Sequence, residues 1–112
     1  MKIALPMTEG QLCAHFGHCQ QFCFIETDEN KNVVNKTFVI PPPHEPGVLP
    51  KWLAENNVNL ILAGGMGVRA QQLLNASNIK VETGVDCSLS PEDAVKAYLG
   101  GTLVTGENAC SH

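Results

Sequence analysis

The chain has 112 residues, of which 44% are hydrophobic and 16% are charged, and its formal net charge is −4 at pH 7. A chain of this length can bury a sufficient core without disulfides, and its mild acidity argues against nucleic acid, which requires a basic face. No apolar run approaches the ~20 residues that span a bilayer, so we expect one cytoplasmic domain over residues 1–112 that binds neither nucleic acid nor membrane.

The five cysteines are not expected to form a disulfide framework. Their number is odd, and the amino-terminal stretch MKIALPMTEG resembles a first strand more than a signal peptide. We therefore interpret the cysteines as thiols, ligands or buried small side chains.

The first part of the chain indicates three strands. Pro6 closes the first apolar run, and a loop containing glycine and histidine is expected over 6–20. The second strand is rich in aromatic and β-favouring residues, and a tight polar turn makes it antiparallel to the third. The expected strands are 2–5, 21–27 and 32–40, followed by a proline-rich loop over 41–47.

The remainder alternates helices and strands. Apolar residues at helical spacing indicate the first two helices, and Ser90 followed by Pro91 provides a typical start for the third. Gly100 and Gly101 should end that third helix. The expected helices are 48–57, 67–77 and 91–101, and the expected strands between them are 58–65 and 79–83.

The element order βββαβαβα predicts an α/β fold with a mixed five-stranded sheet flanked by helices. An antiparallel meander comes first and right-handed parallel crossovers follow, which places the fourth and fifth strands beside the first. Numbered along the chain, the expected strand order in the sheet is 3-2-1-4-5, with strand 2 antiparallel.

The first candidate site is the cysteine- and histidine-rich loop after the first strand. It carries Cys13, His15, His18 and Cys19, and thiolate and imidazole are ligands for soft and borderline metals. The spacing does not match a zinc finger, and a glycine-containing turn with capping histidines is an equally open interpretation. Cys23 lies in the aromatic strand and is expected to be a core thiol.

The second candidate site is the sequence LAGGMGVRA at 62–70, where a buried strand ends in Gly64 and Gly65 and a helix begins near Gly67. Backbone N–H groups at a helix start favour an anion, and Met66 adds a thioether that could touch sulfur or metal. The stretch fits a relaxed dinucleotide fingerprint, but that fingerprint belongs to the first unit of a larger fold. A tight turn that needs glycine for packing is the structural alternative.

The third candidate site is the carboxyl terminus, where Cys110 and His112 could bind one metal ion or belong to a frayed tail. His44, in the proline-rich loop, could act as a ligand on a lid. The chain has no phosphate-binding lysine motif, no nucleophile elbow and no acidic pair on its first strand. These absences favour a binding protein over an enzyme, and no catalytic residue is expected.

Four stretches together resemble the dinitrogenase iron–molybdenum cofactor biosynthesis family, which includes the NifX and NafY proteins and the carboxyl-terminal part of NifB. They are KIALP, HFGH, LILAGGMGVRAQQLL and AYLGGTLVTGENACSH, and they extend over the full chain. The resemblance implies a fold similar to ribonuclease H. It also implies a role in binding or carrying an anionic metal–sulfur cluster or its precursor, of Fe–S, Fe–Mo or Mo–Cu type.

If the family site carries over, His15 and the backbone of 64–67 should face each other at the end of the sheet. The family context suggests cofactor-assembly proteins as partners, including a cluster-loading ATPase. His18 and Cys19 depart from the expected family pattern and add potential ligands. The alternative function is therefore a mononuclear zinc- or copper-binding or metal-sensing protein. A third hypothesis is a nuclease or nucleotide-binding enzyme. The absence of acidic strand residues argues against the nuclease, and the small size of the chain argues against dinucleotide binding.

Overall fold

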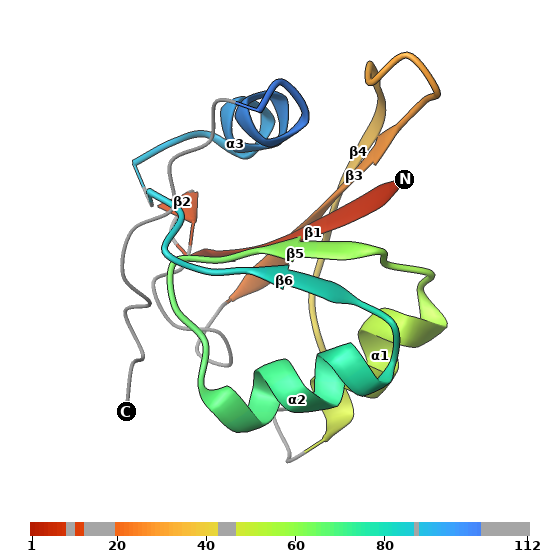
Figure 1. The fold of residues 1–112 in the computed structure, drawn as a ribbon, viewed down its shortest axis with the longest axis vertical. Coiled ribbons are helices and arrows are strands. Elements are labelled where there is room, and N and C mark those ends of the chain that lie inside the picture. Colours follow the sequence, from red (N-terminus) through yellow and green to blue (C-terminus); the bar gives the residue numbers. More distant parts are fainter. Residues whose placement is uncertain (9–10, 13–19, 43–46, 87, 102–112) are drawn as a thin grey trace.

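The computed structural model describes residues 1–8, 11–12, 20–42, 47–86 and 88–101 (Figure 1). These residues form six strands and three helices in a mixed α/β arrangement. In chain order the elements are β1 (Lys2–Thr8), β2 (Gln11–Leu12), β3 (Gln21–Thr27), β4 (Val33–Val39), α1 (Val48–Glu55), β5 (Leu60–Leu62), α2 (Val68–Ala76), β6 (Lys80–Glu82) and α3 (Pro91–Leu99).

The main path of the sheet has the order β4-β3-β1-β5-β6, and β2 pairs with β1 off this path. β1 is antiparallel to β3 and parallel to β5, and β3 is antiparallel to β4. Five of these strands correspond to the five expected from the sequence, and they lie in the expected order. The expected number of strands is wrong, because β2 forms within the segment assigned to a loop. Two residues are too few to produce a strand pattern.

The expected end of the first strand at Pro6 is also wrong, since β1 continues to Thr8. Met1 and Thr27 exchange two backbone hydrogen bonds, of 2.9 and 2.8 Å. Because bonded and non-bonded pairs alternate along an antiparallel ladder, Pro6 and Phe22 form a non-bonded pair. On the other side, the pairing of β1 with β5 ends at Ala4. The missing N–H of Pro6 therefore points away from β3 and removes no bond of the β1–β3 ladder, so the strand continues through the proline.

Helices cover both faces of the sheet, with α1 and α2 on one face and α3 on the other (Figure 1). Alternate residues of the strands enter two separate cores. Ala4, Phe22 and Ile61 pack on the α1–α2 side, whereas Cys23 and Val95 pack on the α3 side. The expectation that Cys23 is a core thiol is confirmed, because its side chain has no exposed surface.

The third helix begins as expected. The Ser90 hydroxyl accepts a hydrogen bond of 3.1 Å from the Asp93 N–H, and Pro91 occupies the first turn. All three helices are shorter than their patterns suggested; α1 ends at Glu55 and α3 ends at Leu99. Over the described ranges, none of the helices has the length and apolar character required to cross a membrane.

Burial of Cys23 should make stability depend on pH in the alkaline range. Burial raises the pKa of this thiol from 9.0 to about 11. Between these values the unfolded thiol loses its proton while the native thiol keeps it, so the free energy of unfolding should fall as pH rises. The fall from this group is at most about 1.4 kcal/mol per pH unit. Denaturant unfolding of the protein and of Cys23→Ala should show a smaller fall in the variant, and equal slopes would contradict the assignment.

Candidate functional site

The carboxyl ends of β1 and β5 define one edge of the molecule. The two strands are parallel neighbours, in which Ile3 pairs with Leu60 and Ala4 with Ile61. The chain leaves β1 toward β3 and leaves β5 toward β6, which lie on opposite sides. In open α/β sheets, ligands bind where connections diverge in this way. The pairing confirms that the strands before the two predicted site segments are neighbours. The expected approach of His15 to residues 64–67 stays a prediction, because His15 lies outside the described residues.

The segment between β5 and α2, residues 63–67, is here called the glycine turn. Gly64 and Gly65 are buried. The carbonyls of Ala63 and Gly64 accept hydrogen bonds of 3.1 and 3.0 Å from the N–H groups of Val85 and Gly84. The turn is thus held by backbone hydrogen bonds to the segment that follows β6.

Gly67 lies directly before α2 and occupies the capping position of that helix. Its φ of −66° and ψ of 154° are accessible to any residue, and a Cβ placed there would meet nothing within 4 Å. Neither backbone conformation nor packing therefore requires glycine at this position. The space around a Cβ at Gly67 is open, and among the described residues no side-chain cap of the first N–H groups is found.

The first turn of α2 is suited to an anion. It contains no acidic residue, and it carries the exposed Arg69. A cation at the positive end of a helix dipole is unfavourable unless a negative charge compensates it. Gln71 completes the start of the helix, because its Nε2 donates a hydrogen bond of 3.0 Å to the carbonyl of Met66. Among the described residues, the helix start therefore combines uncapped donors with positive charge.

Met66 differs from the glycines around it, because its side chain has no exposed surface. It belongs to the core on the α1–α2 side, together with residues such as Leu53 and Leu74. In this structure the thioether contributes to packing. Its expected contact with a bound group stays a prediction.

Thr8, the last residue of β1, is a candidate that sequence reasoning missed. Its Oγ1 is buried and has no hydrogen-bond partner among the described residues. By strand alternation it lies on the same face as Ala4, which is the face that α2 covers. A buried hydroxyl normally has a partner, so this group could bond to a ligand at the edge. Its position two residues after a proline gave no signal in the sequence.

The other predicted ligands lie outside the described residues. These are Cys13, His15, His18, Cys19, His44, Cys110 and His112. Within the ranges that the structure describes, no group of three or more His, Cys, Asp or Glu side chains could hold a metal ion. The described part of the edge therefore consists of the glycine turn, the start of α2 and the end of β1.

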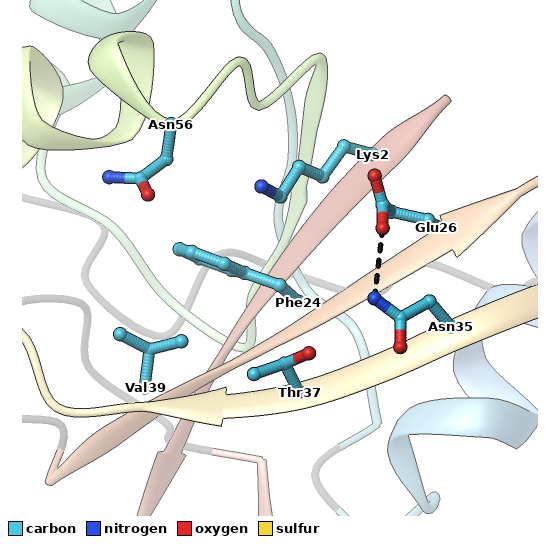
Figure 2. Close-up of a pocket in the computed structure, with 7 residues that line it drawn as sticks. All are labelled: Lys2, Phe24, Glu26, Asn35, Thr37, Val39 and Asn56. Carbon is cyan, nitrogen blue, oxygen red and sulfur yellow. Dashed lines mark hydrogen bonds between the residues drawn. The ribbon is translucent and has the colours of Figure 1, made fainter.

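A separate cavity of about 210 Å³ lies near the amino end of β1, at the opposite end of that strand from the glycine turn (Figure 2). Figure 2 shows Lys2 pointing toward Phe24, and its Nζ lies 5.0 Å from the ring centre. Glu26 accepts a hydrogen bond of 3.0 Å from Asn35. Much of the polar lining is thus engaged within the protein, and this cavity cannot form part of the glycine-turn edge.

Comparison with known proteins gives a consistent result. The family model described as "Dinitrogenase iron-molybdenum cofactor" matches residues 1–101. An uncharacterized protein of Methanocaldococcus jannaschii, MJ0580, is 31% identical over 108 residues, which cover 92% of this chain and 89% of the relative.

Two solved structures are similar over nearly their whole length. The crystal structure of PH0822 has a TM-score of 0.85 and 29% identity and covers 97% of this chain and 99% of its own. The apo form of the orange protein from Desulfovibrio gigas has a TM-score of 0.73 and 24% identity, with coverage of 96% and 93%. At that identity, the second likeness concerns the fold alone.

The burial of Met66 predicts a structural cost that must be separated from any loss of binding. Met66→Ala should lower the free energy of unfolding by about 2–5 kcal/mol, because it leaves a cavity in the core. Met66→Leu should cost less than about 1.5 kcal/mol, since the volume is nearly kept. Denaturant unfolding measures both, with Val68→Ala as an exposed neighbouring control. An unchanged stability in Met66→Ala would show that the side chain does not pack as described.

Proposed function

The chain belongs to the dinitrogenase iron-molybdenum cofactor family, and from this premise we propose that it binds and carries an anionic metal–sulfur cluster or cluster precursor. The observation that carries the proposal is the open, uncapped start of α2 at the edge where the carboxyl ends of β1 and β5 lie side by side. In this proposal the protein is a carrier or scaffold, and it performs no reaction on its cargo.

The physical chemistry of the edge fits such a cargo. A sulfide-rich cluster carries negative charge on surface sulfur atoms, which accept hydrogen bonds from backbone N–H groups. The open space at Gly67 allows a bulky group to approach these donors, and Arg69 supplies a cation in the same turn. The buried hydroxyl of Thr8 is a further candidate donor.

The metal ligands of the proposed site come from the loop between β2 and β3. His15 is the proposed principal ligand, and Cys13, His18 and Cys19 are additional candidates because thiolate and imidazole suit soft metals. Both strands that flank this segment, β2 and β3, pair with β1, and the carboxyl end of β1 lies beside that of β5. A contribution from Cys110 and His112 remains part of the proposal.

The proposed cargo is a metal–sulfur cluster of Fe–S, Fe–Mo or Mo–Cu type. The described residues of the edge select a ligand by its negative charge and not by the identity of its metal. We further propose that cofactor-assembly proteins, including a cluster-loading ATPase, deliver or receive the cargo. The ribonuclease H-like label of the fold and the cytoplasmic location stay predictions.

Reconstitution tests the proposal directly. Incubation without oxygen with iron and sulfide, or with thiomolybdate and copper, should give a protein-bound visible chromophore that remains after gel filtration. His15→Ala should lose most of this absorption while its far-ultraviolet circular dichroism is unchanged. A protein that stays colourless under all these conditions would overturn the cluster proposal. Stoichiometric zinc or copper in that colourless protein, measured by native mass spectrometry, would favour a mononuclear site instead.

Gly67 allows the helix start to be tested separately from the ligands. Gly67→Asp places a carboxylate cap on α2, so stability should be unchanged or rise by up to about 1 kcal/mol. The same carboxylate occupies and repels the proposed anion site, so cluster affinity should fall by about tenfold or more. Gly67→Asn is the neutral control of nearly equal size and should lose less affinity. Equal binding by both variants and the parent would show that the cargo does not approach this helix start.

A further inference from the structure

The outer edge of β4 is the longest open strand edge in the described part of the molecule. β4 pairs with β3 on one side and has no strand partner among the described residues on the other. Its central residues are exposed, whereas the opposite edge of the sheet is the three-residue strand β6. An open edge presents unpaired N–H and C=O groups and is a template for another strand.

One face of this edge is apolar. Val34 and Phe38 of β4 have exposed fractions of 61% and 50%, and Ile40, the residue directly after β4, has one of 76%. Lys36 lies between them in the alternation. The four residues are here called the β4 stripe. Lys36 forms an ion pair with Glu92 of α3, which places the stripe on the α3 side of the sheet. Three large apolar side chains on an open edge strand are unusual in a protein that acts alone.

We propose that β4 pairs antiparallel with β4 of a second copy of this chain, about a twofold axis at Thr37, so that the two sheets become one. The irregularity in the pairing of β4 with β3 falls near Val33, and the regular ladder covers 35–39. Thr37 is the midpoint of that regular segment. An axis there lets the regular parts of both strands align completely.

The axis at Thr37 also gives matched side chains. It places Val34 opposite Ile40 of the second copy, and Lys36 opposite Phe38. Lys36 already lies over the Phe38 ring of its own chain, with Nζ 5.1 Å from the ring centre. Apolar and aromatic cross-strand pairs of this kind stabilise sheets, and two threonines face each other at the axis.

Neighbouring registers fit less well. An axis at Lys36 would set two lysines directly opposite each other, which is destabilising in an antiparallel pair. An axis at Asn35 would place Val34 opposite Lys36. It would also place Phe38 opposite Asn32 of the second copy, which lies outside the regular segment. Of the axes at Asn35, Lys36 and Thr37, the charge pattern therefore favours the one at Thr37 for pairing with a second copy of β4.

A lysine on an edge strand usually prevents pairing, because its charge would have to be buried. Here Glu92 neutralises that charge, and the hydrogen bond from Lys36 lowers the pKa of the Glu92 carboxyl. The ion pair lies within one chain and is carried into the dimer intact. One strand from each copy makes a small interface, so we expect association that depends on protein concentration.

A charge swap at the axis tests the interface. Sedimentation velocity of the parent should show a dimer that dissociates on dilution. Thr37→Lys and Thr37→Glu should each be monomeric at concentrations where the parent is dimeric, because equal charges meet at the axis. An equal mixture of the two should dimerise again, which a folding defect would not explain. Gln72→Lys, on the exposed face of α2, makes the same change in charge as Thr37→Lys and should remain dimeric.

Cross-linking tests the register. Thr37→Cys should form a disulfide between two copies under mild oxidation, and peptide mass mapping should locate the link at position 37 in both chains. Asn35→Cys is the matched control and should not link to itself, because position 35 lies opposite position 39. A parent that is monomeric at all concentrations, or a mixture that does not restore the dimer, would overturn the proposal. A 35–35 link in place of the 37–37 link would overturn the register.

Discussion

The structure depends on the burial of β1 on both faces and along both edges. Its central residues have almost no exposed surface, and each fully buried aliphatic side chain contributes about 1.5–3 kcal/mol. β3 lies antiparallel on one side of β1 and β5 lies parallel on the other. This mixed pairing makes a single edge at which the carboxyl ends of β1 and β5 lie together. The candidate site therefore results from the same pairing that forms the core.

Much of the fold could be predicted because the strands and helices carry strong local patterns. The aromatic strand β3, the strand before the glycine turn and the capped start of α3 are all visible in the sequence. Two features of β1 are not local. Whether Pro6 ends a strand depends on which side its missing N–H faces, and that is set by the register with β3. Similarly, β2 exists because Leu12 can pair with Met7 and fill the core on the α3 side.

The site could be predicted less completely. The glycine turn was recognisable because glycines between a buried strand and a helix allow either a tight turn or the close approach of a ligand. The roles of its individual residues could not be predicted. Met66 and Gly67 are adjacent, yet Met66 is fully buried and Gly67 is exposed. That difference arises from the direction in which the chain enters α2, which composition does not encode. Thr8 becomes a candidate only because no described residue forms a hydrogen bond with its hydroxyl.

The helix starts show how stability and binding are divided within the chain. α3 has a capping serine, a proline in its first turn and two acidic residues near its positive end, which together stabilise it. α2 has none of these, and a side-chain cap there would contribute about 1 kcal/mol. α1 also begins without a side-chain cap, but it follows the edge strand β4. Only α2 among these helices combines an open start with a position directly after a strand that borders β1. A bound anion at the start of α2 would supply the stabilisation that a side-chain cap and acidic residues supply at the start of α3.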